Sequence, residues 1–243
     1  YGGPHILTLV TEVATRALKA VRYQKFNVHL RLRPEALAAR MEKKNEIVAR
    51  LSDYNTSLLE KTYNELEAVG MFNLLGENKL LPMAYCEGSP MHPSYGAGHA
   101  TVAGACVTIL KAFFNHKALV NVSSNGEKLE VKTDGISSSH LFVPNATGTA
   151  LEIDTCNEIV TLEDELNKLA ANISIGRNWA GVHYYTDYTE SLLLGEEIAI
   201  GLLEEQAITY NPDENFKLTL PRFKGGTVII DRNGVRPDDD DIT

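Results

Sequence analysis

A nearly uninterrupted apolar run at residues 102–114 constrains the fold of this chain more than any other feature. The run ends at the polar residues 115–117 and is too short to cross a membrane. A helix that is apolar all round is buried, so we expect a central helix surrounded by others. A glycine-containing turn at residues 96–99 precedes the run. The imidazole of His99 and free backbone N–H groups are therefore expected at the start of the buried helix.

Apolar residues recur at helical spacing over most of the remaining chain. We expect helices at about residues 6–21, 34–40, 57–71, 161–174 and 186–205. In the last of these, Gly195 and Ala199 give a packing face with small residues for close approach. The sequence therefore predicts a single all-α catalytic domain over residues 1–243.

Three segments depart from the helical pattern. Residues 121–151 contain several turn signals and form a loop-rich insertion, with a short strand expected at residues 129–132. By its location the insertion would shape the pocket entrance or an oligomer contact. Residues 216–231 predict a small C-terminal β-hairpin around a Lys-Gly-Gly turn, and residues 236–243 an acidic tail in solvent.

The start of the buried helix also predicts an oxyanion site. Helix N-termini carry unsatisfied donors and a partial positive charge, which attract anions. His92 opens the segment that leads to Gly98 and His99, so an acid/base imidazole would stand beside the bound anion.

Two further segments supply cations and a second imidazole. Arg177 precedes His183 by six residues, and Asp187 follows four residues later. If the chain is helical after Gly181, His183 and Asp187 share one helix face, and the carboxylate orients the imidazole. Lys25 and Arg33 lie in the other segment, where Pro34 favours the first turn of a helix with Arg33 at its mouth.

Each of these residues has a structural alternative. His99 alone is more often a helix cap or a packed surface residue, and Arg177 alone a surface ion-pair partner. Lys25 and Arg33 alone are ordinary helix-flanking cations, and Asp187 is a structural orienter rather than a chemical participant. The combination of cations, imidazoles and a helix terminus favours a small, highly charged anion instead.

The order Lys…Arg-Pro, Gly-x-Gly-His and Gly-Arg-x5-His-x3-Asp resembles the vanadium-dependent haloperoxidases and the type 2 phosphatidic-acid-type acid phosphatases. Residues 32–38, 92–95 and 176–184 are most similar to the vanadium bromoperoxidases of marine algae. The eight-residue step from Lys25 to Arg33 also fits the bromoperoxidases, because the phosphatase spacing is usually one residue shorter. The resemblance covers about residues 5 to 230 and implies a helical bundle.

The resemblance implies a vanadate cofactor and a role for each matching residue. His183 would be the axial ligand of vanadium. Lys25, Arg33, Arg177 and the Gly98 N–H would bind the equatorial oxygens. His99 would contact the apical oxygen and act as acid and base.

Two positions bear on how far the resemblance extends. His92 matches a position that is histidine in many bromoperoxidases and aromatic in chloroperoxidases, which favours bromide or iodide. Ala97 stands where the family usually has serine, so a hydroxyl hydrogen bond to an equatorial oxygen is missing. A hydrogen bond to a charged group contributes about 1.5–3 kcal/mol, so weaker vanadate binding or altered peroxide activation is expected.

The implied reaction is the oxidation of halide by hydrogen peroxide to hypohalous acid, which halogenates a small organic acceptor. The metal would act as a Lewis acid without changing its oxidation state. Acid phosphatase activity, with His183 as nucleophile and His99 as leaving-group acid, is the alternative that shares the same cage. The third hypothesis is a non-catalytic half-protein that binds an oxyanion.

Charge and length bound the partners. The net charge of −9 argues against nucleic acid and anionic membrane surfaces as partners. Members of the family are usually more than twice as long as these 243 residues, which resemble the C-terminal half. A homo-oligomer, or an N-terminal partner chain, is therefore expected to complete the core. The resemblance favours a secreted, cell-wall or periplasmic location, which the residues do not determine.

Overall fold

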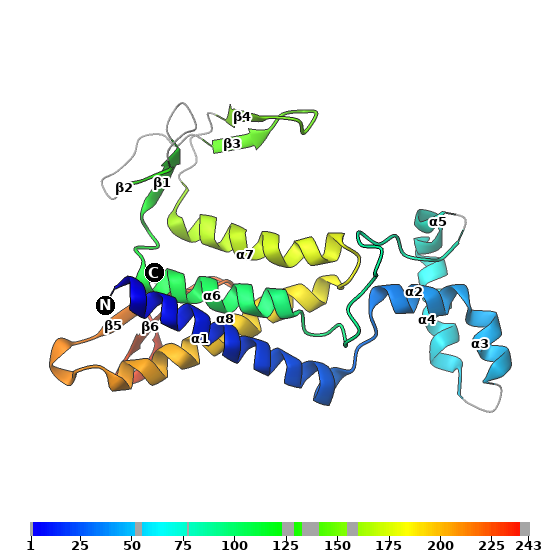
Figure 1. The fold of residues 1–243 in the computed structure, drawn as a ribbon, viewed down its shortest axis with the longest axis horizontal. Coiled ribbons are helices and arrows are strands. Elements are labelled where there is room, and N and C mark those ends of the chain that lie inside the picture. The colour runs from blue at the N-terminus through cyan, green and yellow to red at the C-terminus, as the bar shows by residue number, and fades with distance from the viewer. Residues whose placement is uncertain are drawn as a thin grey trace.

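Helix α6 (Gly98–Phe113) forms the centre of the molecule and contacts three other long helices. These are α1 (Gly3–Tyr23), α7 (Leu162–Trp179) and α8 (Tyr185–Thr209). The computed structural model describes residues 2–51, 55–76, 78–122, 129–132, 141–154 and 160–238. In Figure 1, α6 lies between α1 and α7, with α8 alongside. The expected central helix and helical bundle are thus confirmed.

Glycines let α6 and α8 approach closely. A Cβ atom on Gly104 would lie 2.3 Å from the Leu192 carbonyl oxygen of α8. A Cβ atom on Gly195 would lie 2.1 Å from the Thr101 carbonyl oxygen of α6. Neither distance is compatible with a side chain, so the crossing requires glycine at both positions. The small-residue face expected in α8 is confirmed.

The core of the bundle joins α1, α6 and α8 to the C-terminal sheet. Its fully buried members include Leu9, Val13, Ile109, Leu203 and Ile230. A second, smaller cluster lies between α6 and α7 around Val107 and Ala170. None of the helices in the described part of the chain has the length and hydropathy to span a bilayer.

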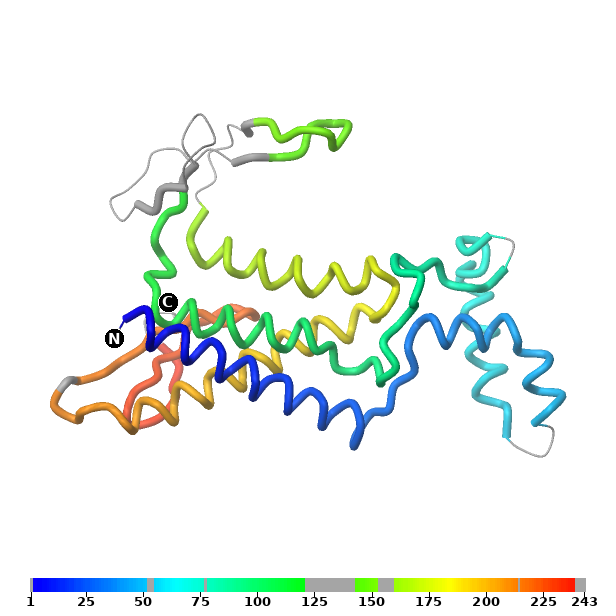
Figure 2. The backbone as a smooth tube through the Cα atoms, in the orientation of Figure 1, coloured from blue at the N-terminus to red at the C-terminus, as the bar shows by residue number. Residues whose placement is uncertain are grey.

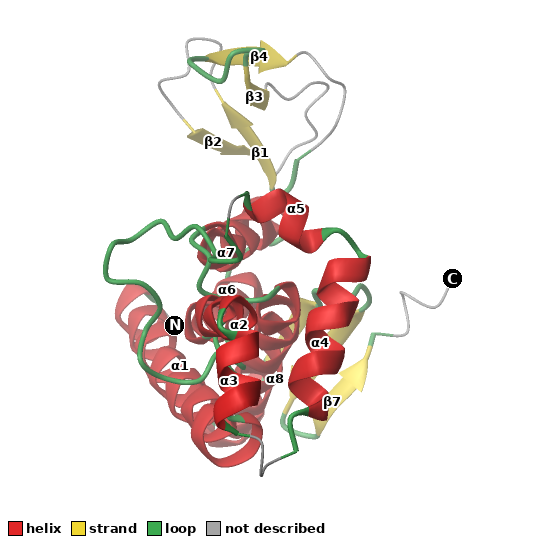
Figure 3. Ribbon diagram, turned by 90° about the vertical axis from the view of Figure 1, so that its right-hand side faces the viewer, coloured by secondary structure: helices red, strands yellow, loops and turns green. Residues whose placement is uncertain are grey.

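Residues 24–97 leave one end of the bundle and return to it (Figure 2). The excursion contains the π-helical turn η1 (Gln24–His29), then α2 (Pro34–Glu42), α3 (Lys44–Arg50), α4 (Ser57–Ala68) and α5 (Met71–Leu75). Viewed from that end, α2 to α5 lie in front of the bundle (Figure 3). We call α2 to α5 the helical arm. Among the described residues, no side chain of α3, α4 or α5 is buried.

The insertion lies at the opposite end from the helical arm (Figure 1). It holds two antiparallel strand pairs, β1 (Leu119–Val122) with β2 (Leu129–Lys132) and β3 (Leu141–Pro144) with β4 (Leu151–Asp154). The strand expected at residues 129–132 is therefore present. Residues 123–128, 133–140 and 155–159 of this region lie outside the described residues.

The C-terminal hairpin is extended by a third strand. After the short 3₁₀ turn η2 (Pro212–Glu214), β5 (Lys217–Pro221) pairs with β6 (Thr227–Asp231), as expected, and β6 also pairs with β7 (Gly234–Pro237). The proposed acidic tail at residues 236–243 needs correction at its start. Arg236 and Pro237 belong to β7, because Asp231–Gly234 forms a tight turn that returns the chain along β6. Residues 239–243 lie outside the described residues.

Candidate oxyanion site

Arg33 joins the three sequence segments in one place. It is the N-cap residue of α2, with Pro34 at the first helical position as expected, and its side chain is buried. Its Nη1 donates to the Val182 carbonyl at 2.7 Å and lies 3.0 Å from His183 Nε2. Burial, together with the nearby Arg177 charge, lowers the pKa of Arg33 to about 10 despite the opposing effect of Asp187.

His92 holds the other side of the same guanidinium. Its carbonyl accepts from Arg33 Nε at 2.9 Å, and its Nδ1 lies 3.0 Å from Arg33 Nη2. Burial and then the Lys25 charge lower the pKa of His92. The neutral ring therefore accepts a hydrogen bond from Arg33 and orients it.

Lys25 lies on the π-helical turn that extends α1, which the sequence analysis did not predict. Single π-turns occur frequently at functional sites. The Nζ atom donates to the carbonyls of Pro93, at 2.7 Å, and Ser94, at 3.1 Å. The residue is 2% exposed. Burial, followed by repulsion from Arg33, lowers the pKa of Lys25 to about 7.

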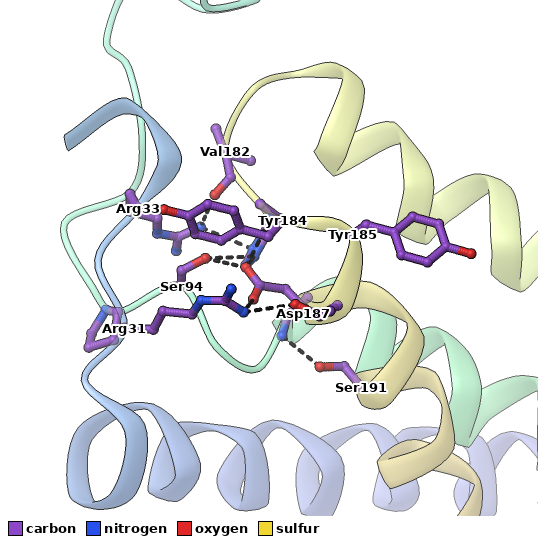
Figure 4. Close-up of polar contacts among 12 residues, drawn as sticks. Arg31, Arg33, Ser94, Val182, Tyr184, Tyr185, Asp187 and Ser191 are labelled. Carbon is purple, nitrogen blue, oxygen red and sulfur yellow. Dashed lines mark hydrogen bonds and ion pairs between the residues drawn. The ribbon is translucent and has the colours of Figure 1, made fainter. Parts of the chain in front are cut away.

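His183 is held by Asp187, but not on a shared helix face. Helix α8 begins at Tyr185 with Tyr184 as N-cap, so His183 precedes the helix, and the shared face, which depended on a helix starting after Gly181, is not formed. Asp187 is in the first turn, where its Oδ2 reaches back to the Tyr184 N–H at 3.0 Å and His183 Nδ1 at 3.0 Å (Figure 4). Helix capping explains this arrangement, because an acidic side chain in the first turn accepts hydrogen bonds from N–H groups that precede the helix.

This contact determines which nitrogen of His183 is available. Burial lowers the pKa of His183 to about 4, even though Asp187 opposes the shift. The neutral ring donates Nδ1–H to Asp187 and presents the Nε2 lone pair toward Arg33. Asp187 stays ionised: burial alone would raise its pKa, but hydrogen bonds from His183, Ser94 and the Tyr184 N–H bring it below the ordinary value.

The N-terminus of α6 completes the site. Ala97 is its N-cap residue and offers no side-chain cap, while the Ala97 N–H donates to Ser191 Oγ at 2.7 Å. The N–H groups of Gly98 and His99, at the first two helical positions, have no acceptor within the helix. Of the described residues, a Cβ atom on Gly98 would meet only Leu18 Cδ1, at 4.0 Å, so an anion can approach its backbone.

Arg177 and His99 face the site from α7 and α6. Arg177 Nε is buried and has no hydrogen-bond partner among the described residues. His99 is exposed to the cavity, and burial followed by the charges of Arg177 and Lys25 lowers its pKa. A neutral His99 is able to take up a proton.

A cavity of about 680 Å³ brings most of these groups together. It is lined by the predicted site residues Lys25, Arg33, His92, Gly98, His99 and Arg177. Its other lining residues are mainly apolar and include Leu18, Phe26, Val102, Cys106 and Ile173. His183 is absent from the lining because Arg33 stands between its Nε2 and the cavity.

The family model of the VCPO second helical-bundle domain matches residues 8–209. The chain belongs to this family. It is 46% identical to a vanadium-dependent bromoperoxidase of Corallina pilulifera and 47% identical to one of Corallina officinalis. Each match covers 95% of this chain and 37% of the relative's own length. A solved homohexameric vanadate-dependent bromoperoxidase of Ascophyllum nodosum matches with a TM-score of 0.61 and 27% identity, over 95% of this chain and 40% of that one. The resemblance inferred from the motifs is confirmed.

The site of this VCPO second helical-bundle domain fits an oxyanion such as vanadate. Arg177 Nε is a buried donor that finds no partner in the part of the chain that the structure describes, and the Gly98 backbone is open there. Within the described ranges, neither Lys25, Arg33 nor Arg177 forms an ion pair with a carboxylate. Buried cations without counter-charges are stabilised when an anion binds.

Three residues of the site in this domain were not predicted from the sequence. Ser94 donates its hydroxyl to Asp187 Oδ2, Arg31 Nη1 pairs with Asp187 Oδ1 at 2.8 Å, and Ser191 holds the Ala97 N–H. Ser94 and Arg31 lie inside segments singled out by their motifs, yet nothing in the spacing indicates their contacts. Ser191 follows Asp187 by four residues, and this helical spacing was the available signal.

Proposed function

We propose that this chain carries the vanadate-binding, halide-oxidising site of a bromoperoxidase. The observation that carries the proposal is the neutral His183, whose Nε2 lone pair faces Arg33 in a group of cations without carboxylate counter-charges. The names of the Corallina relatives support vanadium dependence and bromide as the halide. The chain spans 37% of the length of those relatives, so we propose halide oxidation for the site in this chain and not for a whole protein.

The roles follow from which atoms are free to bind. His183 Nε2 would bond to vanadium, which requires Arg33 Nη1 to give up its 3.0 Å contact with that nitrogen. Arg33 would then share its donors between the Val182 carbonyl and a vanadate oxygen. Lys25, Arg177 and the Gly98 N–H would bind the other oxygens, with hydrogen bonds strengthened by the charge.

The reaction would be H₂O₂ + Br⁻ + H⁺ → HOBr + H₂O. When bound by these residues, vanadate would supply the Lewis acidity that halide oxidation by peroxide requires. His99, neutral at ambient pH, takes a proton from entering peroxide and returns it to the leaving oxygen. Lys25 provides a buried positive charge that stabilises the developing negative charge.

The cavity wall bears on the acceptor and the halide. Leu18, Phe26 and Val102 give it an apolar lining next to the cations, which supports a small organic acceptor. His92 lines the cavity and contacts Arg33. We retain the proposal that a histidine at this position favours bromide or iodide as the halide.

The decisive experiment is bromination of an indicator dye by metal-stripped protein with peroxide and bromide. Turnover that requires orthovanadate and disappears in His183→Ala supports the proposal. Hydrolysis of p-nitrophenyl phosphate without halide turnover would replace it with acid phosphatase activity, because an imidazole oriented by a carboxylate also suits a nucleophile. Orthovanadate binding without either activity would indicate a non-catalytic oxyanion site.

We also propose that the chain forms a homo-oligomer. The helical arm exposes Leu58, Val69 and Leu74 and has no buried side chain in α3 to α5 among the described residues. These residues lie on α4, on its C-cap and on α5, and an interface that covers them would remove their apolar surface from water. The homohexamer of the Ascophyllum relative supports self-association. A native mass of one chain for active protein would contradict it.

A further inference from the structure

Ser94 and Arg31 form a closed network with Asp187 (Figure 4), whose carboxylate contacts the imidazole of His183. The Ser94 hydroxyl donates to Asp187 Oδ2, and Arg31 Nη1 pairs with Asp187 Oδ1 at 2.8 Å. The Ser94 backbone N–H donates to the Arg31 carbonyl at 2.8 Å, which closes the ring. Three segments distant in sequence thus hold one carboxylate.

The Asp187 carboxylate is fully saturated by this network. Its side chain is 0% exposed, and Oδ2 also accepts from His183 Nδ1 and the Tyr184 N–H. A buried carboxylate with both oxygens occupied cannot rotate without losing charge-assisted hydrogen bonds. The direction of its bond to His183 is therefore set by Ser94 and Arg31.

Arg31 is itself held in place. Its Nη1 also donates to Thr186 Oγ1 at 2.8 Å, and its guanidinium lies over the Tyr184 ring at 4.2 Å. Stacking on an aromatic face fixes the plane of an arginine. Arg31 thus acts as a rigid clamp rather than a mobile surface charge.

Ser94 also connects the imidazole to the cations. Its carbonyl accepts from Lys25 Nζ at 3.1 Å, while its hydroxyl supports Asp187. One residue therefore positions a cation of the cavity and the carboxylate behind His183.

We infer that Arg31 and Ser94 are positioning residues that aim His183 Nε2 at the bound oxyanion through Asp187. The inference rests on the proposed function of His183 as the vanadium ligand. Partners behind a ligating histidine fix its ring orientation and tautomer, and their loss typically weakens metal affinity by about 10- to 100-fold. Neither residue touches the cavity, so their effect must pass through Asp187 and His183.

The test compares Arg31→Gln and Ser94→Ala with two matched controls. Arg16→Gln removes an arginine with the same 39% side-chain exposure and ion pairs of 2.7 Å, located on α1 away from the site. Ser174→Ala removes another buried hydroxyl, which donates to the Ala170 carbonyl at 2.7 Å. Circular dichroism verifies that every variant is folded.

Two readouts separate positioning from a structural role. The first is the orthovanadate Kd, which we expect to rise about 10- to 100-fold in Arg31→Gln and Ser94→Ala but not in the controls. The second is the NMR signal of His183 Nδ1–H, measured without vanadate, which should lose its protection from solvent exchange in the same two variants. Unchanged Kd and unchanged Nδ1–H protection in both variants would overturn the inference.

A double-mutant cycle shows whether the effect passes through Asp187. If it does, Arg31→Gln should add nothing to Asp187→Asn, whereas additive losses would refute that route. Arg31→Lys should bind orthovanadate more tightly than Arg31→Gln, because it keeps the positive charge. If wild-type protein binds no orthovanadate, the proposed function fails, and the Nδ1–H comparison alone decides whether Arg31 and Ser94 hold the imidazole.

Discussion

Arg33 Nη1 donates a 3.0 Å hydrogen bond to His183 Nε2, the nitrogen proposed to bind vanadium. The imidazole is thus held between Asp187 on one side and Arg33 on the other. Arg33 keeps Nε2 unprotonated and shields it from the cavity. The same guanidinium is placed to bind an oxyanion once Nε2 is engaged.

We therefore expect Arg33→Ala to weaken orthovanadate binding. Loss of a hydrogen bond to a charged group costs about 1.5–3 kcal/mol, which corresponds to a roughly 10- to 100-fold increase in Kd. Isothermal titration calorimetry measures it, with Arg16→Ala as the matched control on α1. Wild-type affinity in Arg33→Ala would remove Arg33 from the binding set.

Anion binding should also depend on pH through Lys25. Its pKa of about 7 in the free protein means that the cation is lost as pH rises above 7. Because binding then requires uptake of a proton, affinity should fall by up to about tenfold per pH unit above 7. Sulfate is a suitable probe because it does not titrate between pH 6 and 9. Lys25→Met should bind more weakly with a flat profile, and an equally steep profile in this variant would assign the dependence to another group.

His183 predicts a loss of stability in acid. Its pKa of about 4 in the folded protein lies below the ordinary value of 6.5, so the unfolded chain binds the proton first. Stability should therefore fall as pH drops from about 6.5 to 4, by about 3 kcal/mol from this residue. Urea unfolding across this window measures it. His183→Gln should lose less stability over the same interval than the wild type, and equal losses would contradict the assignment.

The elements of the bundle were predictable because their signals are local. The apolar run of α6 and the hairpin turn at Gly225 and Gly226 each act through neighbours in sequence. Strand β7 was missed because Pro237 has low strand propensity and Arg236 and Pro237 join the sheet only by pairing with β6.

The site was predictable only in part, because some of its contacts join segments that are far apart in the sequence. Motif order indicated which cations and imidazoles to expect, and the structure lines the cavity with Lys25, Arg33 and Arg177. The π-turn that carries Lys25 and the contacts of Arg31 and Ser94 depend on segments far apart in the chain. Spacing along one segment contains no information about such contacts.

The crossing of α6 and α8 yields a stability prediction. Gly195→Ala would place Cβ 2.1 Å from the Thr101 carbonyl oxygen and 2.7 Å from the Ala105 nitrogen, both backbone atoms that cannot move independently. We expect a loss of about 3 kcal/mol or more in the free energy of unfolding. Gly201→Ala, on the same helix, meets nothing within 4 Å and should gain up to about 1 kcal/mol. Chemical denaturation compares them, and similar effects at both positions would contradict the close packing.

Ala97 offers a test by gain of function. It is the N-cap residue of α6, 1% exposed, and has no side-chain hydrogen bond to the helix. Ala97→Ser would introduce the hydroxyl that the resemblance leads us to expect here and would add a donor beside the Gly98 N–H. We expect orthovanadate to bind about 10- to 100-fold more tightly, from a hydrogen bond of about 1.5–3 kcal/mol to a charged group. Calorimetric titration of both proteins measures the change.

The control must separate anion binding from helix capping, because serine is also a better N-cap residue than alanine by about 1 kcal/mol. Ala97→Gly improves the cap nearly as much but has no hydroxyl to donate. Both variants should therefore raise the melting temperature, while only Ala97→Ser should lower the orthovanadate Kd. Equal affinities in the two variants would mean that the side chain at position 97 acts on the helix and not on the bound anion.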